Sequence, residues 1–336
     1  MKHSRASTVL VVIGVLFLLL SPAWAWGITP LFIKLPPDLK VVTDFKGTLT
    51  LYADNVTRLF FPPGQEKVVP LTIHAEDKSM LDKSNSRVLV IAEHVEVKDA
   101  ITGLLLEGVR PQATYVLDRR TSENVPGYMK GIDRSGWSMT FPLGSKKRGY
   151  PIWDDELNRS IVYDFVRRDK IDGDRYKGVP IYVYRSAGAM EKMAKPPPGL
   201  PETLTGKQLK EMSGRSDLPI LDGASMKLEF YKKMESTQYV EPRTGMVVYV
   251  PRLHYEYYVK NGPGMSPEYL KLAAIEYSRT IDNARTDVDG AAKYFKLIDL
   301  DQKWTPLSFL LTGPALIAVG VALRLRSARK ETAPPA

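Results

Sequence analysis

Two acidic stretches in the middle of the chain carry the residue types best suited to metal binding or acid–base chemistry. They are WDDELN, residues 153–158, and DKIDGDRYKG, residues 169–178. Carboxylates near glycine are what a calcium loop provides, although neither stretch has the full EF-hand spacing. Two acids for glycoside hydrolysis are a second interpretation, but sequence spacing does not give the separation of carboxyl groups in space. An acidic surface turn explains both stretches, so we predict neither a metal nor a cofactor.

The other residue types with catalytic potential form no recognisable catalytic pattern. His3, His74, His94 and His254 are scattered, and no H-E-x-x-H sequence is present. Cysteine is absent, which removes thiol nucleophiles, thiolate zinc sites and disulfides. No G-x-S-x-G nucleophile elbow occurs, and GLPETLTGKQ, residues 199–208, lacks the glycine spacing and terminal hydroxyl of a phosphate-binding loop. We therefore expect a protein that is not an enzyme.

An uncharged run near the end of the chain constrains where the rest must lie. Residues 304–323 contain no charged side chain and are rich in Leu, Ile, Val, Ala and Gly. At 1.5 Å per residue, such a helix crosses a hydrocarbon core of about 30 Å. A soluble core helix would keep a polar stripe, which this run lacks. We predict a membrane span here, with Trp304, Arg324 and Arg326 at its interfaces.

A second apolar run lies within residues 1–33. A cleaved secretory signal is one interpretation, because SPAWAW, residues 21–26, has small residues in an A-x-A arrangement. Apolar residues continue beyond it, and Trp24 and Trp26 suit a bilayer interface, so we favour an uncleaved span.

Basic residues on the terminal sides of both spans predict the topology. An excess of Lys and Arg marks the cytoplasmic side of a span. We expect both termini, including the tail 324–336, in the cytoplasm, and residues 34–303 outside it. The tails supply a large part of the formal net charge of +9, so the high pI does not predict nucleic-acid binding.

Alternation of apolar and polar residues dominates the central block. RLHYEYYVK and MKLEFY have period two, and further candidate strands are TLTLYA, KVVPLTIHA, RVLVIAEHVEV, ATYVLD, IVYDFV and VPIYVYR. A proline-rich spacer at 194–207 separates expected halves at about 34–193 and 208–265. We predict a mainly β fold with α: a large antiparallel β-rich ectodomain, one long C-terminal helix and two terminal transmembrane helices.

Two candidate hairpins share one signature. TYVLDRRTSENV, residues 114–125, and TQYVEPRTGMVV, residues 237–248, both have an aromatic residue, valine, an acid, Arg-Thr and a return to valine. Asp118 or Glu241 would enter the turn, with Thr121 or Thr244 inside it. Convergent hairpin chemistry and a duplicated half-domain both remain open.

After the last strand the apolar period changes to three and four. Ser266, Pro267 and Glu268 form a helix-start signal, so we predict a helix over about 267–298. A heptad seam on it would either pack along the sheet, which we favour, or pair with another copy. The seam residues are Leu270, Ala274, Tyr277, Ile281, Ala284, Val288, Ala291, Phe295 and Ile298.

Three stretches resemble the PorA-type porin family, a group of largely uncharacterised actinobacterial envelope proteins. TYVLDRRT, GWSMTFPLGSKKRGYPIWD and GVPIYVYR are similar to that family's DRRTG-like turn, its aromatic-proline stretch ending in Trp-Asp, and its next strand. YVEPRTG and the terminal spans also fit the family's layout, while Ser122 stands where the family often has glycine. The residues carrying the resemblance are Asp118, Arg119, Arg120, Thr121, Phe141, Pro142, Tyr150, Trp153, Asp154, Gly178, Tyr182, Glu241, Arg243 and Thr244.

The plan of two terminal spans around one β-rich ectodomain also resembles the class B scavenger receptors, which carry lipids through an internal tunnel. Our first hypothesis is therefore a membrane-anchored envelope protein that binds or transfers an apolar, lipid-like ligand. The alternative is a subunit of an oligomeric, porin-like channel, since a chain with two apolar helices does not look like a transmembrane barrel. An envelope enzyme acting on sugar or lipid ranks third. The expected partners are the bilayer, an apolar ligand and further copies of the chain.

Overall fold

The computed structural model describes residues 2–28, 33–52, 67–106, 112–169, 180–197, 202–213, 216, 221–260 and 269–331. The chain divides into two compact units. One, the helix unit, comprises Met1–Lys34 with Ala292–Ala336, and the other, the sheet unit, is Leu35–Ala291. Each unit is described by itself below.

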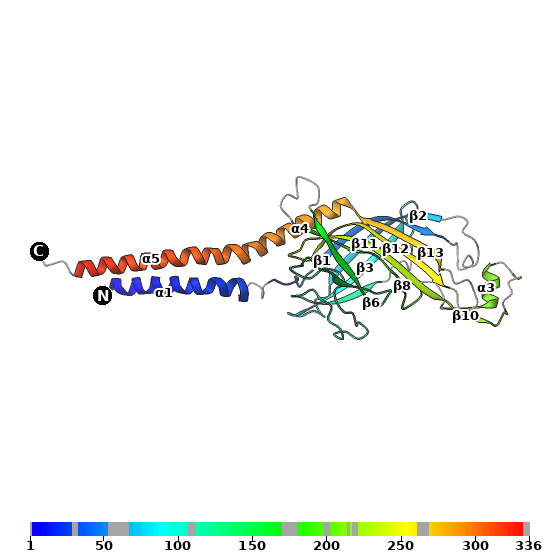
Figure 1. Cartoon of the computed structure of the whole chain (residues 1–336), viewed down its shortest axis with the longest axis horizontal. Helices are drawn as coiled ribbons and strands as arrows, with labels where there is room; N and C mark the ends of the chain where they lie inside the picture. The colour runs from blue at the N-terminus through cyan, green and yellow to red at the C-terminus, as the bar shows by residue number, and fades with distance from the viewer. Residues whose placement is uncertain are drawn as a thin grey trace. The chain divides into compact units, whose positions relative to one another are not determined.

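The sheet unit is built on one large antiparallel sheet (Figure 1). Its strand order is β4-β3-β2-β1-β13-β12-β11-β7-β6-β5, with β8 paired to β11 and a separate two-stranded pair β10-β9. Strands from both sides of the proline-rich spacer share this sheet, because β11 pairs with β7 and β12. The strands are β1 (Lys40–Leu51), β2 (Lys67–Ser79), β3 (Val88–Asp99), β4 (Ala113–Asp118), β5 (Tyr150–Asp154), β6 (Arg159–Asp169), β7 (Ile181–Ser186), β8 (Met190–Lys192), β9 (Thr203–Thr205), β10 (Ser225–Lys227), β11 (Glu229–Val240), β12 (Val247–Lys260) and β13 (Tyr269–Arg279).

Period-two patterning puts alternate residues of these strands into one main core. The buried β2 residues Val69, Leu71, Ile73 and Ala75 are an example, and apolar residues of β3, β11, β12 and β13 join them. Both faces of the β3–β4 edge are covered, because two smaller apolar clusters form there. The predicted mainly β fold with terminal helices is confirmed.

The predicted helix over 267–298 is wrong in its first half. Tyr269–Arg279 form β13, and helix α4 (Ile281–Asp299) begins only after it. β13 is an interior strand hydrogen-bonded to β1 and β12, and Ile275 and Tyr277 are buried in the main core. Pairing on both edges therefore outweighs a local helical pattern that also fits period two. The helix-start residues 266–268 lie outside the described residues.

The heptad seam is lost with that helix. Three of its members lie on β13 rather than on a helix: Leu270, Ala274 and Tyr277. Three others lie on α4 and are buried inside the chain: Ala284, Val288 and Ala291. Ile298 is half-buried, and the side chains of Ile281 and Phe295 lie outside the description. A continuous four-repeat seam for pairing with another copy does not exist in the described residues.

A buried ion pair fixes the start of α4 to the sheet. An Nη2 atom of Arg279 lies 2.8 Å from Oδ2 of Asp287, and both side chains are largely buried. Arg279 also donates to Thr43 Oγ1 at 2.7 Å and to the Val247 carbonyl at 2.5 Å. Because removing one partner would leave an uncompensated buried charge, this pair fixes where the strand ends and the helix begins.

The helix unit is an antiparallel pair of apolar helices. Helix α1 (Lys2–Ala23) and helix α5 (Thr305–Glu331) lie side by side, with both termini at the same end of the pair (Figure 1). A Cβ added to Gly14 would lie 2.6 Å from the Gly313 carbonyl oxygen, and one added to Gly313 would lie 2.8 Å from that of Gly14. The backbones thus touch where both helices have glycine, as in membrane helix pairs.

Polar and aromatic contacts close the other end of this pair. Trp24 Nε1 donates to Asp301 Oδ1 at 3.1 Å, and the Trp24 ring meets Phe309 edge to face. Ser21 donates its hydroxyl to the Pro306 carbonyl at 2.9 Å. Trp304, Arg324 and Arg326 are exposed, and the side chain of Trp26 lies outside the description. The interface roles predicted for these residues stay predictions.

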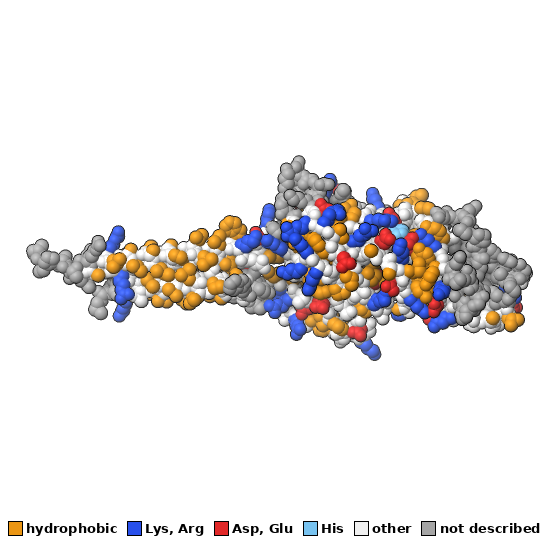
Figure 2. All heavy atoms as spheres, in the orientation of Figure 1, with side chains coloured by type: hydrophobic (Ala, Val, Ile, Leu, Met, Phe, Trp, Pro, Cys, Tyr) orange, Lys and Arg blue, Asp and Glu red, His pale blue; other side chains and the backbone are white. Residues whose placement is uncertain are grey.

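The outer surface of the helix pair is apolar. Figure 2 shows hydrophobic side chains over most of it, with Lys and Arg near the end that holds the termini. Residues 5–23 and a helical run over 282–328 are each long and apolar enough to cross a membrane. The exposed large apolar residues include Val9, Val12, Leu16, Leu19, Leu310, Leu311, Val319 and Leu323.

Candidate functional site

The first candidate hairpin of the sequence is a turn held by its own acid. Asp118 ends β4, and its Oδ1 accepts the N–H groups of Arg120 at 2.8 Å and Thr121 at 3.1 Å. Ser122 has a φ of 57° and donates its N–H to the Asp118 carbonyl. Partial burial raises the pKa of Asp118, but these N–H groups and Arg87 outweigh it and hold that pKa below its usual value. The carboxylate is therefore a turn-forming group.

The second hairpin repeats this geometry between β11 and β12. Glu241 accepts the N–H of Arg243 at 3.1 Å and both the N–H and the hydroxyl of Thr244, at 2.8 and 2.7 Å. Gly245 has a φ of 70° and donates its N–H to the Glu241 carbonyl at 2.9 Å. Ser122 and Gly245 thus occupy equivalent positions, and the left-handed backbone that glycine adopts in the second turn is adopted by serine in the first.

Two further turns have the same design and were missed from the sequence. Asp99 Oδ1 accepts the N–H groups of Ile101 and Thr102, and Gly103 has a φ of 72°. Asp154 Oδ1 likewise accepts the N–H groups of Glu156 and Leu157, and Asn158 has a φ of 53°. DAITG, residues 99–103, carried the recognisable signal of acid, two residues, threonine and glycine. Four such turns favour convergent hairpin chemistry over a duplicated half-domain.

The backbone of Phe141 joins the first two turns. Ser122 donates its hydroxyl to the Phe141 carbonyl at 2.9 Å, and Phe141 donates its N–H to the Gly245 carbonyl at 2.9 Å. Gly144 donates its N–H to the Arg243 carbonyl at 2.9 Å. Residues 141–144 follow the first turn in the sequence and pack against the second turn, about a hundred positions later.

The Phe141 side chain lies in an aromatic cluster of the main core. Its ring stacks on Tyr184 with centroids 4.4 Å apart and meets Tyr150 and Tyr163 edge to face. Burial raises the pKa of Tyr163 to about 12 and raises that of Tyr184 as well, so both phenols stay protonated. Tyr184 donates its hydroxyl to the Lys146 carbonyl at 2.7 Å. This arrangement stabilises the fold and offers no acid–base group near pH 7.

A buried lysine is the most unusual charge in the described part of the sheet unit. Lys232 on β11 is 3% exposed, and its Nζ lies 2.7 Å from Asp154 Oδ2 and 2.6 Å from Glu156 Oε2. Burial disfavours the charged amine, but Glu156 and Asp154 outweigh it and raise the pKa of Lys232. Tyr257 donates its hydroxyl to Glu156 at 3.0 Å. The ammonium is therefore held charged, between two carboxylates.

This cluster uses the acids that suggested a calcium loop. Asp154 is engaged by two backbone N–H groups and by Lys232, and Glu156 by Lys232 and Tyr257. Asp169 pairs with Arg167, and residues 172 and 174 lie outside the described residues. Groups of three or more His, Asp or Glu placed to hold a metal do not occur among the described residues. The acids of the first stretch serve turns and ion pairs.

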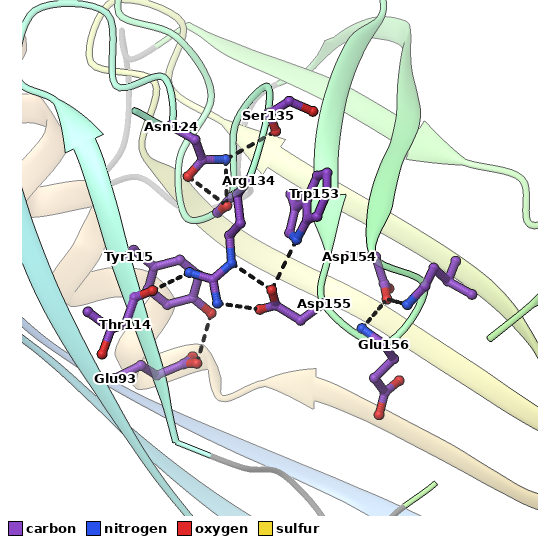
Figure 3. A network of polar contacts seen from close by, with 12 residues as sticks. Glu93, Thr114, Tyr115, Asn124, Arg134, Ser135, Trp153, Asp154, Asp155 and Glu156 are labelled. Atoms are coloured by element: carbon purple, nitrogen blue, oxygen red, sulfur yellow. Dashed lines mark hydrogen bonds and ion pairs between the residues drawn. The ribbon is translucent and has the colours of Figure 1, made fainter. Parts of the chain in front are cut away.

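The neighbouring acid Asp155 belongs to a separate polar network, shown in Figure 3. Arg134 forms a bidentate ion pair with Asp155: its Nε donates to Oδ1 at 2.6 Å and its Nη2 donates to Oδ2 at 2.9 Å. Arg134 also lies 4.5 Å from the Tyr115 ring centre, and Tyr115 donates its hydroxyl to Glu93 at 2.9 Å. Trp153 donates its indole N–H to Asp155 at 3.0 Å. The network ties the β5–β6 turn to β3 and β4.

The structure thus gathers most of the motif residues around the aromatic cluster and its turns. Tyr182 on β7 packs edge to face against Phe165 on β6, and Phe165 also contacts Tyr184 of this cluster. Arg119 donates its Nε–H to the carbonyl of Leu35, the first residue of the sheet unit, at 2.9 Å. Arg120 is exposed, and Gly178 lies outside the described residues. Lys232 and Arg134 could not be found from local sequence patterns, because their partners are distant in the chain.

Comparisons with known proteins point to one family. The family model described as Porin PorA matches residues 6–322. A curated relative named Porin PorA, from Corynebacterium amycolatum, is 25% identical over 225 residues, which cover 58% of this chain and 55% of the relative. The match therefore spans about half the length of that relative.

Proposed function

The chain belongs to the PorA porin family, and from this premise we propose that it is a membrane-anchored subunit of a cell-envelope channel formed by several copies. The family match covers most of each terminal helix and the β-rich block between them. The name of the Corynebacterium relative supports a channel, and neither comparison supports the lipid-like ligand expected from the sequence.

The need for several copies follows from the helix pair. Gly14 and Gly313 bring the backbones of α1 and α5 into contact, so the pair encloses no pore of its own. A water-filled path along these helices then requires helices from neighbouring subunits. This argument replaces the heptad seam as the reason for self-association.

Three hydroxyl side chains in the first turns of α5 carry the proposal. Thr305, Ser308 and Thr312 are spaced three and four residues apart, so they share one face of the helix. Ser308 and Thr312 are exposed beside an otherwise apolar surface, and both donate their hydroxyls to backbone carbonyls one turn earlier. Exposed hydroxyls suit the wall of a polar pore better than contact with lipid tails.

We further propose that both termini face the cytoplasm and that the sheet unit lies outside it. The antiparallel pairing of α1 and α5 supports termini on one side, and the basic residues near both ends support the cytoplasmic side.

Single-channel recording with cysteine probes tests the proposal, since the natural sequence has no cysteine. Purified full-length protein is expected to give discrete conductance steps in planar bilayers. A charged thiol reagent should block the Thr312→Cys variant and leave Leu310→Cys, on the opposite face of α5, unaffected. Folded protein without conductance, or equal block of both variants, would refute this pore.

A further inference from the structure

One of the four acid-held turns differs from the others in what lies against it. The Asp99 turn, residues 99–103, has the backbone of the Glu241 turn, with Gly103 in the place of Gly245. A Cβ on Gly245 would lie 2.1 Å from the Phe141 carbonyl oxygen, whereas one on Gly103 would have none of the described residues within 4 Å. The same turn is therefore covered in one place and open in the other.

At the Glu241 turn, residues 141–144 are bound through two carbonyls, and this segment itself turns at Leu143 and Gly144, where Gly144 has a φ of 72°. The turn's fifth residue, Gly245, accepts the N–H of Phe141, and its third residue, Arg243, accepts the N–H of Gly144. Pro142 has no N–H to satisfy between them. The sequence Phe-Pro-x-Gly thus matches the acceptors that this turn presents.

At the Asp99 turn, the corresponding carbonyls are those of Ile101 and Gly103. Within the described residues, no hydrogen bond reaches either carbonyl. The surrounding side chains are apolar and unusually exposed, with Ile101 at 80%, Leu104 at 68% and Leu105 at 52%. Asp99 Oδ1 accepts the N–H groups of Ile101 and Thr102, so this carboxylate oxygen is engaged by the backbone of its own turn.

We propose that the Asp99 turn is a docking site for a Phe-Pro-x-Gly segment of a partner protein, bound in the turned conformation in which residues 141–144 are bound at the Glu241 turn. The carbonyls of Gly103 and Ile101 accept the N–H groups of the incoming Phe and Gly. The incoming aromatic ring lies against Ile101, Leu104 and Leu105, which replaces water on apolar surface. Backbone hydrogen bonds give the register, and the apolar contact gives the preference for an aromatic residue.

The chain itself provides two probe peptides. Phe-Pro-x-Gly occurs at 141–144 and again at 61–64, and the second copy lies outside the described residues. Fluorescently labelled hexapeptides of residues 140–145 and 59–64 can be titrated with full-length protein in detergent, with anisotropy as the readout. Saturable binding of both is expected. The inference does not depend on the channel function, since this assay needs no conductance.

Two variants locate the binding surface. Leu104→Asp puts a charge where the ring would lie and should weaken binding at least about tenfold. Leu81→Asp is the matched control, because Leu81 is 63% exposed in a different turn, and it should leave binding unchanged. Because neither residue is buried, both variants should keep the melting temperature of the wild type. Measuring it shows that any loss of binding does not come from unfolding.

A modified peptide tests the hydrogen bonds. Methylation of the Phe backbone nitrogen removes the N–H offered to Gly103 and should weaken binding by roughly two- to tenfold. Absent binding, equal losses in the Leu104 and Leu81 variants, or full affinity of the methylated peptide would each overturn the proposal. So would a protein dimer that Leu104→Asp dissociates without any peptide binding, since the occupant would then be a second copy docking in another way.

Discussion

Ser122 and Gly245 approach Phe141 from two turns and satisfy both polar groups of its backbone. The Ser122 hydroxyl donates to the Phe141 carbonyl at 2.9 Å, and the Gly245 carbonyl accepts the Phe141 N–H at 2.9 Å. Because the Phe141 side chain is only 1% exposed, these two bonds hold a core aromatic residue in place without a regular strand. The close approach leaves no room for a side chain at position 245.

This contact predicts unequal costs for two glycine substitutions. Gly245→Ala adds a Cβ 2.1 Å from a backbone oxygen and strains a φ of 70°, whereas Gly103→Ala strains a φ of 72° in open space. We expect Gly103→Ala to lower the free energy of unfolding by about 1 kcal/mol and Gly245→Ala by several kcal/mol. Denaturant unfolding of the full-length protein measures both. Equal losses would contradict the close packing of the turn on Phe141.

The buried lysine predicts a large loss when it is neutralised. Lys232→Met leaves Asp154 and Glu156 without their cation and should cost about 3–5 kcal/mol of unfolding free energy. Lys192→Met is the control, because Lys192 pairs with Glu229 at the surface and should cost less than about 1 kcal/mol. Chemical unfolding compares the two. A Lys232 variant as stable as the Lys192 variant would show that the cluster is not buried in solution.

The lowered pKa of Glu256 on β12 predicts that stability depends on pH. Partial burial raises the pKa of Glu256, but hydrogen bonds from Lys271, Tyr258 and His254 outweigh it and lower that pKa to about 2. Since the folded pKa lies below the ordinary value of 4.5, this stabilisation is present above pH 4.5 and is lost as pH falls toward 2. After a discount for solvent screening, the loss between pH 6 and 3 is about 1 kcal/mol.

Unfolding of the wild type and Glu256→Gln at several pH values isolates this contribution. The advantage of the wild type over the variant should shrink between pH 5 and 3 and disappear as pH falls toward 2. An advantage that stays constant over that range would show that Glu256 titrates at its ordinary pKa.

The helix pair predicts which glycine substitution separates α1 from α5. Gly313→Leu forces a large side chain against the Gly14 backbone and Leu18, and should lower stability by about 1–3 kcal/mol or more. Ala315→Leu adds the same bulk on an exposed face of α5 and should be nearly neutral. Thermal denaturation in detergent followed by size exclusion distinguishes them. Similar melting temperatures would argue against glycine packing between the two helices.

Local chemistry made much of the fold predictable. The strands of the central block follow from period-two alternation, and the Asp118 and Glu241 turns follow from an acid placed before Arg-Thr. The terminal helices follow from uncharged runs near both ends of the chain. In each case the signal and the hydrogen bonds that it specifies lie within a few residues of each other.

The sequence-based predictions failed where contacts between residues distant in the chain determine the structure. Residues 269–279 fit both a heptad and an alternating pattern, and only the neighbouring strands β1 and β12 make the strand more stable. Lys232 gave no signal, because Asp154 and Glu156 approach it from a turn 76 and more positions earlier. The acids of that turn were predicted to form an acidic surface turn, and their ion pairs with Lys232 were missed for the same reason.

The sequence by itself determined the elements of this protein: apolar terminal helices, alternating strands and acid-held turns. Each depends on hydrogen bonds and side-chain periodicity within a short segment, which residue order specifies directly. The tertiary structure alone decided that Phe141 joins two turns, that a lysine is buried between two carboxylates, and that no described residue packs on Gly103 in the Asp99 turn. Those features depend on which surfaces meet after strands distant in the sequence pair, and burial then sets the energy of each charge and backbone group.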